Sequence, residues 1–301
     1  MQGIEGPDVH LDQIRGDLAI QTLIKAVEQG YQVALVDGGS SPDFTAKVQS
    51  FGIHAIPQEN KGMAASRRQV LNAASSFDQT HVIAWVEPEK VGMMDVLSIL
   101  KGRMITEEAD MVIPSRTEAG YNSYPQQQAK SEKQANRFFN KVLRVVRLFP
   151  EKYPDLDAFF GPRVFRNTPE MLELFTAIYD LKDHSKLAGK VKPDNYLNAT
   201  FFPIVLALAR GKKVIGVPVD YMHPSRQTVF ENGKPEFEQK RTDQKWDIIR
   251  GTVDFARYVM NTGKTSALDD TSERSTWKKV MDFYKKWIVV ATVELKNKTD
   301  H

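Results

Sequence analysis

The chain has 301 residues, of which 41% are hydrophobic and 26% charged, and these fractions are typical of a soluble globular protein. The net charge of +3 is too small to indicate nucleic-acid binding, and the absence of cysteine excludes disulfides and thiolate metal sites. No stretch approaches the roughly 20 apolar residues that span a bilayer, and the N-terminus has no apolar signal segment, so we expect a cytoplasmic protein with no transmembrane segment.

The first third of the chain alternates helical and strand patterns. The spacing of apolar residues predicts helices over residues 11–29, 42–51, 60–74 and 91–100, and strands over residues 33–36, 53–56, 81–86 and 109–114. The runs "VALV" and "HVIAWV" are continuously apolar, which is typical of strands covered on both faces. The alternation predicts a doubly wound sheet with helices on its faces.

The pattern changes after residue 115. Residues 115–130 are polar, and we expect them to form a mobile loop. The next elements are helices over residues 132–148, 169–179 and 196–210, and strands over residues 157–165 and 212–224. We expect one α/β domain over residues 1–230 and a helical extension over residues 231–301, with helices at 236–261 and 275–296. An apolar stripe in the last helix faces the core or a partner in a homodimer, or, because lysines flank it, a membrane surface, and it comprises Trp277, Met281, Tyr284, Trp287, Ile288 and Ala291.

Polar groups follow three of the predicted strands at the point where each strand ends. They are Asp37-Gly38-Gly39-Ser40, then Asn60-Lys61-Gly62 with Arg67 and Arg68 on the next helix, then Glu87-Pro88-Glu89. In a parallel sheet these turns share one edge, and carboxylates together with basic side chains suit a metal-bound diphosphate. The Walker A pattern and G-x-G-x-x-G are both absent, which argues against P-loop hydrolases and ordinary Rossmann dehydrogenases.

The order of several stretches resembles a known family. They are "VALVDGGSS", "NKGMAASRRQVLNAA", "HVIAWVEPE", "ADMVIPSR", "FFGPRVF" and "GKKVIGVPVDYMHP". Over residues 32–226 they resemble a nucleotide-sugar glycosyltransferase of the GT-A fold and of the family-2-like kind. The resemblance implies an α/β fold, namely a GT-A-like doubly wound mixed sheet flanked by helices. It also implies transfer of a sugar from a nucleotide-diphosphate-sugar donor to an acceptor, with help from Mn²⁺ or Mg²⁺.

The resemblance also implies roles for individual residues. The donor site would comprise Asp37, Gly38, Gly39, Ser40, Lys61, Gly62, Arg67 and Glu87. Glu87 and Glu89 take the place of the metal-binding D-x-D element, unless they are solvated loop acids paired with Lys90, and His223 matches a further metal ligand. The acceptor side would comprise Asp157, Gly161, Arg163 and Arg226, unless Asp157 and Arg163 form a structural pair. The two arginines favour a small or anionic acceptor. Asp194 is the candidate catalytic base.

Three departures from the family pattern leave two alternatives open. "MQGIEGPDVH" does not supply the family's first strand, E-P-E is longer and stiffer than D-x-D, and Asp194 is the one acidic residue in "KPDNYLNATFFPIV", where a base is expected. The first alternative is a degenerate, non-catalytic protein that binds a nucleotide sugar. The second is a nucleotidyltransferase, which normally needs a glycine-rich signature on the first strand.

Overall fold

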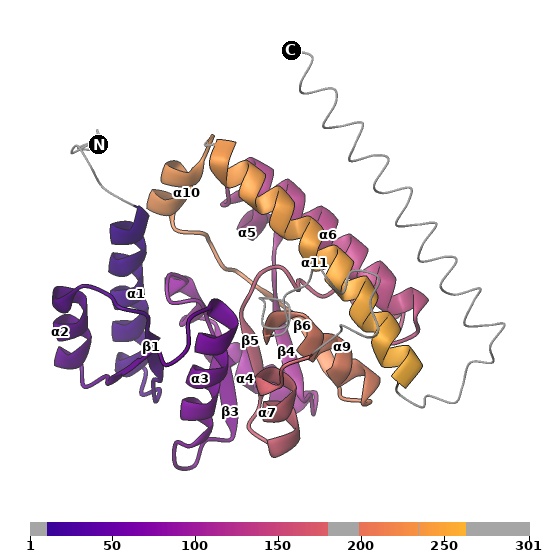
Figure 1. Cartoon of the computed structure of the whole chain (residues 1–301), viewed down its shortest axis with the longest axis horizontal. Helices are drawn as coiled ribbons and strands as arrows, with labels where there is room; N and C mark the ends of the chain where they lie inside the picture. The colour runs from indigo at the N-terminus through magenta and orange to yellow at the C-terminus, as the bar shows by residue number, and fades with distance from the viewer. Residues whose placement is uncertain (1–10, 180–198, 234, 263–301) are drawn as a thin grey trace.

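The computed structural model describes residues 11–179, 199–233 and 235–262, and in them helices surround short strands (Figure 1). The helices are α1 (Leu11–Glu28), α2 (Pro42–Ser50), α3 (Met63–Ser75), the 3₁₀ turn η1 (Val91–Met93), α4 (Leu97–Thr106), α5 (Glu118–Asn122), α6 (Gln126–Val145), α7 (Pro169–Thr176), α9 (Phe202–Ala209), α10 (Ser225–Glu231) and α11 (Pro235–Thr262). The strands are β1 (Leu35–Asp37), β2 (Ala55–Pro57), β3 (Val82–Trp85), β4 (Met111–Arg116), β5 (Arg163–Arg166) and β6 (Val214–Val219). The alternation predicted as far as β4 is confirmed.

The described strands form two sheets. β1 pairs with β2 in parallel, and the larger sheet has the order β3-β5-β4-β6. β5 is antiparallel to both of its neighbours, whereas β4 and β6 are parallel. The predicted mixed sheet flanked by helices is therefore confirmed. Because β5 runs against the others, its first residues lie at the edge where β3, β4 and β6 end, and this edge carries much of the candidate site.

The prediction that the first and third strands are covered on both faces is wrong. All three residues of β1 are only partly buried, and in β3 only Ile83 is buried while Ala84 is exposed. The reason is that no described strand pairs with β1 on its side toward β3. Val33 packs in the same apolar cluster as Val82, and Thr80 Oγ1 donates a hydrogen bond to Gln32 Oε1 at 3.2 Å. The two runs are thus neighbours through side chains, without a hydrogen-bonded ladder.

The prediction of a mobile loop over residues 115–130 is also wrong. β4 extends to Arg116, Thr117 caps α5 by accepting a hydrogen bond from the backbone N of Gly120 at 3.2 Å, and α6 begins at Gln126. Some of the polar residues that suggested a loop face inward, among them Arg116 and Gln128, which are each only 6% exposed, whereas Glu118, Gln126 and Gln127 are exposed. Part of the polarity in this segment therefore belongs to an internal hydrogen-bonded network.

Several element boundaries differ from the prediction. Residues 91–100, predicted as one helix, form η1 followed by α4, and a β-carbon on Gly92 would lie 3.3 Å from the Tyr221 ring. Helix α10 was not predicted, and it lies against α1. The predicted helix at 275–296 and its apolar stripe lie outside the described residues, as does the first part of the predicted helix at 196–210.

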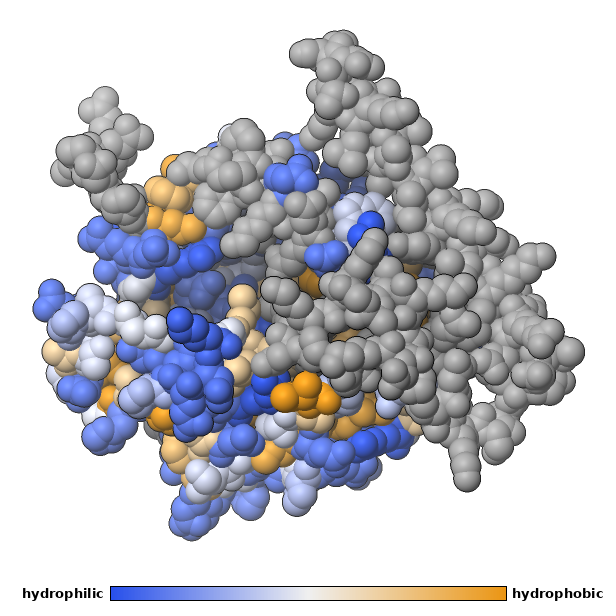
Figure 2. Space-filling view, in the orientation of Figure 1, coloured by the Kyte–Doolittle hydropathy of each residue, from blue (hydrophilic) through white to orange (hydrophobic). Residues whose placement is uncertain are grey.

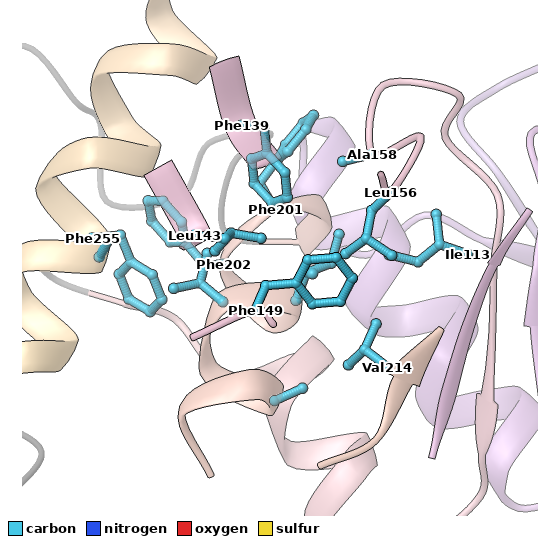
Figure 3. Packing of buried hydrophobic residues seen from close by; sticks show 14 of the residues in the cluster. Ile113, Phe139, Leu143, Phe149, Leu156, Ala158, Phe201, Phe202, Val214 and Phe255 are labelled. Atoms are coloured by element: carbon cyan, nitrogen blue, oxygen red, sulfur yellow. The ribbon is translucent and has the colours of Figure 1, made fainter. Parts of the chain in front are cut away.

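The main hydrophobic core lies between the larger sheet and helices α6, α7, α9 and α11 (Figure 3). Alternate β4 residues face opposite sides, with Met111 in this core and Val112 in a second cluster with α4. Phe255 of α11 stacks on Phe202 of α9, with ring centroids 4.0 Å apart. The described part of the predicted extension therefore packs on the α/β core, while the boundary between residues 230 and 231 stays a prediction.

Replacing Phe255 with alanine should lower the free energy of unfolding of the whole α/β core. Phe255 is fully buried, and truncating such a phenylalanine typically costs about 3–5 kcal/mol. Urea unfolding followed by circular dichroism measures the change. Val229→Ala is the matched control, because this side chain is 77% exposed on α10 and should change stability by less than about 0.5 kcal/mol. A loss in Phe255→Ala no larger than that of the control would contradict the prediction, and two separate unfolding transitions would show an independent extension.

Candidate functional site

The first turn of the site follows β1, where Ser40 holds the side chain of Asp37. The backbone N of Ser40 donates to Asp37 Oδ1 at 3.0 Å, and its hydroxyl donates to the same oxygen at 2.6 Å. Gly39 has a φ of +103°, which residues with side chains rarely adopt. Ser41, not Asp37, caps α2, since its Oγ accepts from the backbone N of Phe44 at 3.3 Å. The carboxylate of Asp37 is therefore oriented by its own turn and is not used as a helix cap.

The second turn follows β2 and is joined to the first by Gln58. Its backbone N donates to the carbonyl of Asp37 at 2.9 Å, and its side-chain Nε2 donates to the carbonyl of Asn60 at 2.6 Å. A β-carbon on Gly38 would lie 2.8 Å from Gln58 Oε1, so any larger residue there would displace the amide. Gln58 thus fixes the two turns relative to each other.

An open cavity of about 590 Å³ lies beside these two turns and α2. Its lining comprises Asp37, Gly38, Gly39, Thr45, Gln49, Ala55, Pro57, Gln58, Glu59 and Lys61. The structure therefore brings Asp37 and Lys61 together, whereas Arg67 and Glu87 are not among the described residues that line the cavity. The visible surface over α2 and α3 is mostly hydrophilic (Figure 2). Small-molecule sites usually occupy roughly 300–1,000 Å³, so the cavity is large enough for a nucleotide.

Arg67 lies on α3, which begins after Gly62 and packs against β3. Its guanidinium sits 4.3 Å from the centre of the Trp85 ring, and Nη1 donates to Thr200 Oγ1 at 3.4 Å. The residue is only 7% exposed. The structure therefore places Arg67 between α3 and β3, and its predicted contact with a nucleotide stays a prediction.

The third turn follows β3 and faces the start of β5. Trp85 pairs with Arg163, and the same antiparallel register continued by two residues places Glu87 opposite Gly161. Gly161 has a φ of +109°, and a β-carbon there would overlap the Glu87 carboxylate. Oε2 of Glu87 is buried and accepts no hydrogen bond from the described residues. Glu87 is thus held against the sheet edge and is not a solvated loop acid.

Lys90 lies beside the Glu87 carboxylate. Its backbone N donates to the Glu87 carbonyl at 3.0 Å, closing a turn with Pro88 in its second position, and its Nζ lies 4.0 Å from Glu87 Oε2. Burial disfavours the charge on Lys90, but the attraction of Glu87, and to a smaller extent of Tyr221 and Glu89, outweighs burial and raises the pKa of Lys90. The turn therefore contains a positive charge of its own.

The residues predicted to bind a metal do not fit a divalent ion as the structure arranges them. The ammonium of Lys90 already lies beside Glu87, and His223 Nδ1 is 2.7 Å from Thr228 Oγ1. The His223 ring packs against Tyr124, with centroids 4.2 Å apart. Within the described ranges, no group of three or more Asp, Glu or His residues is placed to hold a metal. The predicted Mn²⁺ or Mg²⁺ site is not confirmed.

A buried ion pair lies beneath this edge. Arg116 donates to Asp157 through Nε at 2.8 Å and through Nη2 at 2.9 Å, and its Nη1 donates to Glu132 at 2.6 Å. Asn136 of α6 donates to both Asp157 and the hydroxyl of Tyr121. Burial alone would raise the pKa of Asp157, but the charge and hydrogen bonds of Arg116 hold that pKa below its ordinary value. The network joins β4, α6 and the approach to β5.

A family model described as Glycosyl transferase family 2 matches residues 17–169, which is just over half of the chain. The chain belongs to glycosyl transferase family 2. This membership supports glycosyltransferase activity, and it agrees with the mixed α/β fold. The matched region contains the turns with Asp37 and Glu87, and it ends before β6 and His223. Searches of curated proteins and of solved structures gave no significant match. No described helix combines the length and the apolar character that crossing a bilayer requires.

The residues predicted for the acceptor side of this glycosyltransferase are mostly structural in their contacts. Arg163 is fully buried and donates to the backbone carbonyls of Pro162 at 2.7 Å and Ala158 at 2.6 Å. The predicted structural pair of Asp157 with Arg163 is not formed, because Asp157 pairs with Arg116 instead. Arg226 is exposed and pairs with Asp17 of α1 at 3.1 Å, while Asp194 lies outside the described residues.

Two residues of the candidate site were not predicted from the sequence, namely Gln58 and Tyr124. No pattern in the sequence indicates them, since their contacts join segments that are distant along the chain. Lys90 was expected only as a partner of solvated glutamates, whereas the structure places it beside the buried Oε2 of Glu87.

Replacing Asp157 with asparagine should destabilise the glycosyltransferase strongly at neutral pH. The substitution leaves Arg116 buried without its main partner, which typically costs about 3–5 kcal/mol. Because the pKa of Asp157 is lower in the folded protein than in the unfolded chain, its contribution is complete above the ordinary value of 3.8 and declines as the pH falls through the lowered folded value. The difference between wild type and Asp157→Asn should therefore shrink at about pH 3.

Urea unfolding at the two pH values measures this difference. Asp17→Asn is the matched control, since its pair with Arg226 is about half exposed and such pairs contribute at most about 1 kcal/mol. A cost for Asp157→Asn that equals the control, or that grows on acidification, would contradict the assignment.

Proposed function

We propose that this family-2 glycosyltransferase binds a nucleotide-diphosphate sugar in the cavity beside Asp37 and Lys61 and transfers the sugar to an acceptor. The observation that carries the proposal is the joining of two turns at the ends of parallel strands β1 and β2. Ligands of open α/β sheets bind at such strand ends. The oriented carboxylate of Asp37 suits the hydroxyl or N–H donors of a nucleoside, and Lys61 suits the diphosphate.

The proposal commits to the donor and not to an acceptor class. The expectation of a small or anionic acceptor rested on Arg163 and Arg226, and their contacts inside the protein give that expectation no support. The family resemblance implies a divalent metal, but the predicted ligands do not fit one as the structure arranges them, and no part of the proposed donor site depends on it. The alternatives of a non-catalytic binder and a nucleotidyltransferase are distinguished by products: sugar release or transfer for the glycosyltransferase, pyrophosphate release for the nucleotidyltransferase, and no turnover for the binder.

Replacing Asp37 with alanine should weaken binding of the donor's nucleoside part by tenfold or more, since one charge-assisted hydrogen bond contributes about 1.5–3 kcal/mol. Calorimetry with a panel of nucleoside diphosphates measures the affinities, and a bound ligand at 100 times its dissociation constant should add about 2.7 kcal/mol to wild-type stability. Asp43→Ala is the control, because it removes an exposed carboxylate from the first turn of α2, outside the cavity lining. Unchanged affinity in folded Asp37→Ala would refute the donor site.

Replacing Lys61 with glutamine should weaken the binding of nucleoside diphosphates but not the binding of free nucleosides. Lys61 lines the cavity, and its ammonium has a role only if the ligand carries phosphate there. We expect a drop of roughly 10- to 100-fold for the diphosphate, smaller at high salt, and no change for the free nucleoside. Equal losses for both ligands would place Lys61 at the nucleoside, or would indicate a general distortion of the turn.

A further inference from the structure

The ammonium of Lys90 lies beside Glu87, one of the two glutamates that the sequence analysis assigned as metal ligands. Its Nζ lies 4.0 Å from Glu87 Oε2, and the rings of Phe160 and Tyr221 lie 5.2 and 5.9 Å from it. The Lys90 side chain is 12% exposed and that of Glu87 is 20% exposed. Two aromatic faces and a carboxylate therefore surround the ammonium, a combination that stabilises a cation.

The elements around Lys90 fix its place. Lys90 closes the E-P-E turn through its backbone N, and Gly161 leaves the space into which the Glu87 carboxylate fits. Phe160 precedes β5 and Tyr221 follows β6, so three strands of the larger sheet contribute to the surroundings of the ammonium. An arrangement drawn from three strands is not an incidental surface pair.

We propose that the ammonium of Lys90 is the resident cation of the E-P-E turn and takes the place that a divalent ion would occupy beside Glu87 and Glu89. A divalent ion beside Glu87 would be repelled by the ammonium at short range. This exclusion of the metal does not rest on the proposed donor site, since neither Glu87 nor Lys90 is among the described residues that line the cavity.

Calorimetry of the full chain with Mn²⁺ alone tests the exclusion. We expect wild type to show no Mn²⁺ binding that depends on Glu87. Lys90→Gln should bind Mn²⁺ at least tenfold more tightly than wild type, because the carboxylates are then left without their cation. Adding Glu87→Gln to Lys90→Gln should abolish this gain. Lys25→Gln is the matched control, since it removes a lysine paired with Asp95 at 2.8 Å elsewhere on the surface and should leave Mn²⁺ affinity unchanged.

The proposal is overturned if wild type binds Mn²⁺ as tightly as Lys90→Gln does, or if Glu87→Gln alone removes Mn²⁺ binding from wild type. Should Lys90→Gln fail to fold, the wild-type measurement decides, because binding that depends on Glu87 refutes the proposal and its absence supports it. No nucleotide enters these measurements. If the donor site is wrong, Asp37→Ala keeps its nucleotide affinity, and the Mn²⁺ measurements are unaffected. If the metal exclusion is wrong, the Mn²⁺ measurements show it, and the nucleotide affinity of Asp37→Ala is unaffected.

Discussion

The buried pair of Arg116 and Asp157 is the interaction on which the arrangement of the larger sheet's edge depends. Arg116 is the last residue of β4, and Asp157 precedes β5, so the pair fixes where the chain turns back into the sheet. The rings of Tyr121, Tyr124 and Phe160 lie 4.2, 4.8 and 5.0 Å from the guanidinium carbon. A buried charge pair needs several hydrogen bonds and favourable contacts of this kind, because they offset the free-energy cost of removing both charges from water. Phe160 donates its backbone N–H to the carbonyl of Asp157 at 3.2 Å, and its ring lies 5.2 Å from the Lys90 ammonium, so the pair is connected to the E-P-E turn.

The antiparallel direction of β5 connects the Arg116–Asp157 pair to the turn that contains Glu87. In an all-parallel sheet the strand beside β3 would present its last residues to Glu87, whereas β5 presents Gly161 and the segment anchored by Asp157. One register thus connects the Glu87 turn to the Arg116 network across a single strand. A glycine at residue 161 satisfies two requirements at once, namely a positive φ and space for a carboxylate.

The sequence predicted what depends on local pattern and missed what depends on distant contacts. The strand before Asp37 and the helix that begins at residue 42 follow from short-range chemistry and were predicted correctly. The partial exposure of β1 was not predicted, because an apolar run does not reveal whether a neighbouring strand exists. Inward-facing polar residues such as Gln128 led to the prediction of a loop. A single sequence does not show whether a polar side chain contacts water or a buried hydrogen-bonded network. The direction of β5 was likewise beyond local pattern.

The two parts of the candidate site follow strands of different sheets. Asp37 ends β1 and Lys61 follows β2 of the small sheet, whereas Glu87 and Lys90 follow β3 of the large one. Between β1 and β3 the described residues provide apolar packing and the side-chain bond of Thr80 to Gln32, but no backbone ladder. Spacing within each sheet is fixed by hydrogen bonds, whereas spacing between the sheets relies on weaker side-chain contacts. A ligand that contacts both turns must therefore order their separation as it binds, and part of its binding free energy is used for that ordering.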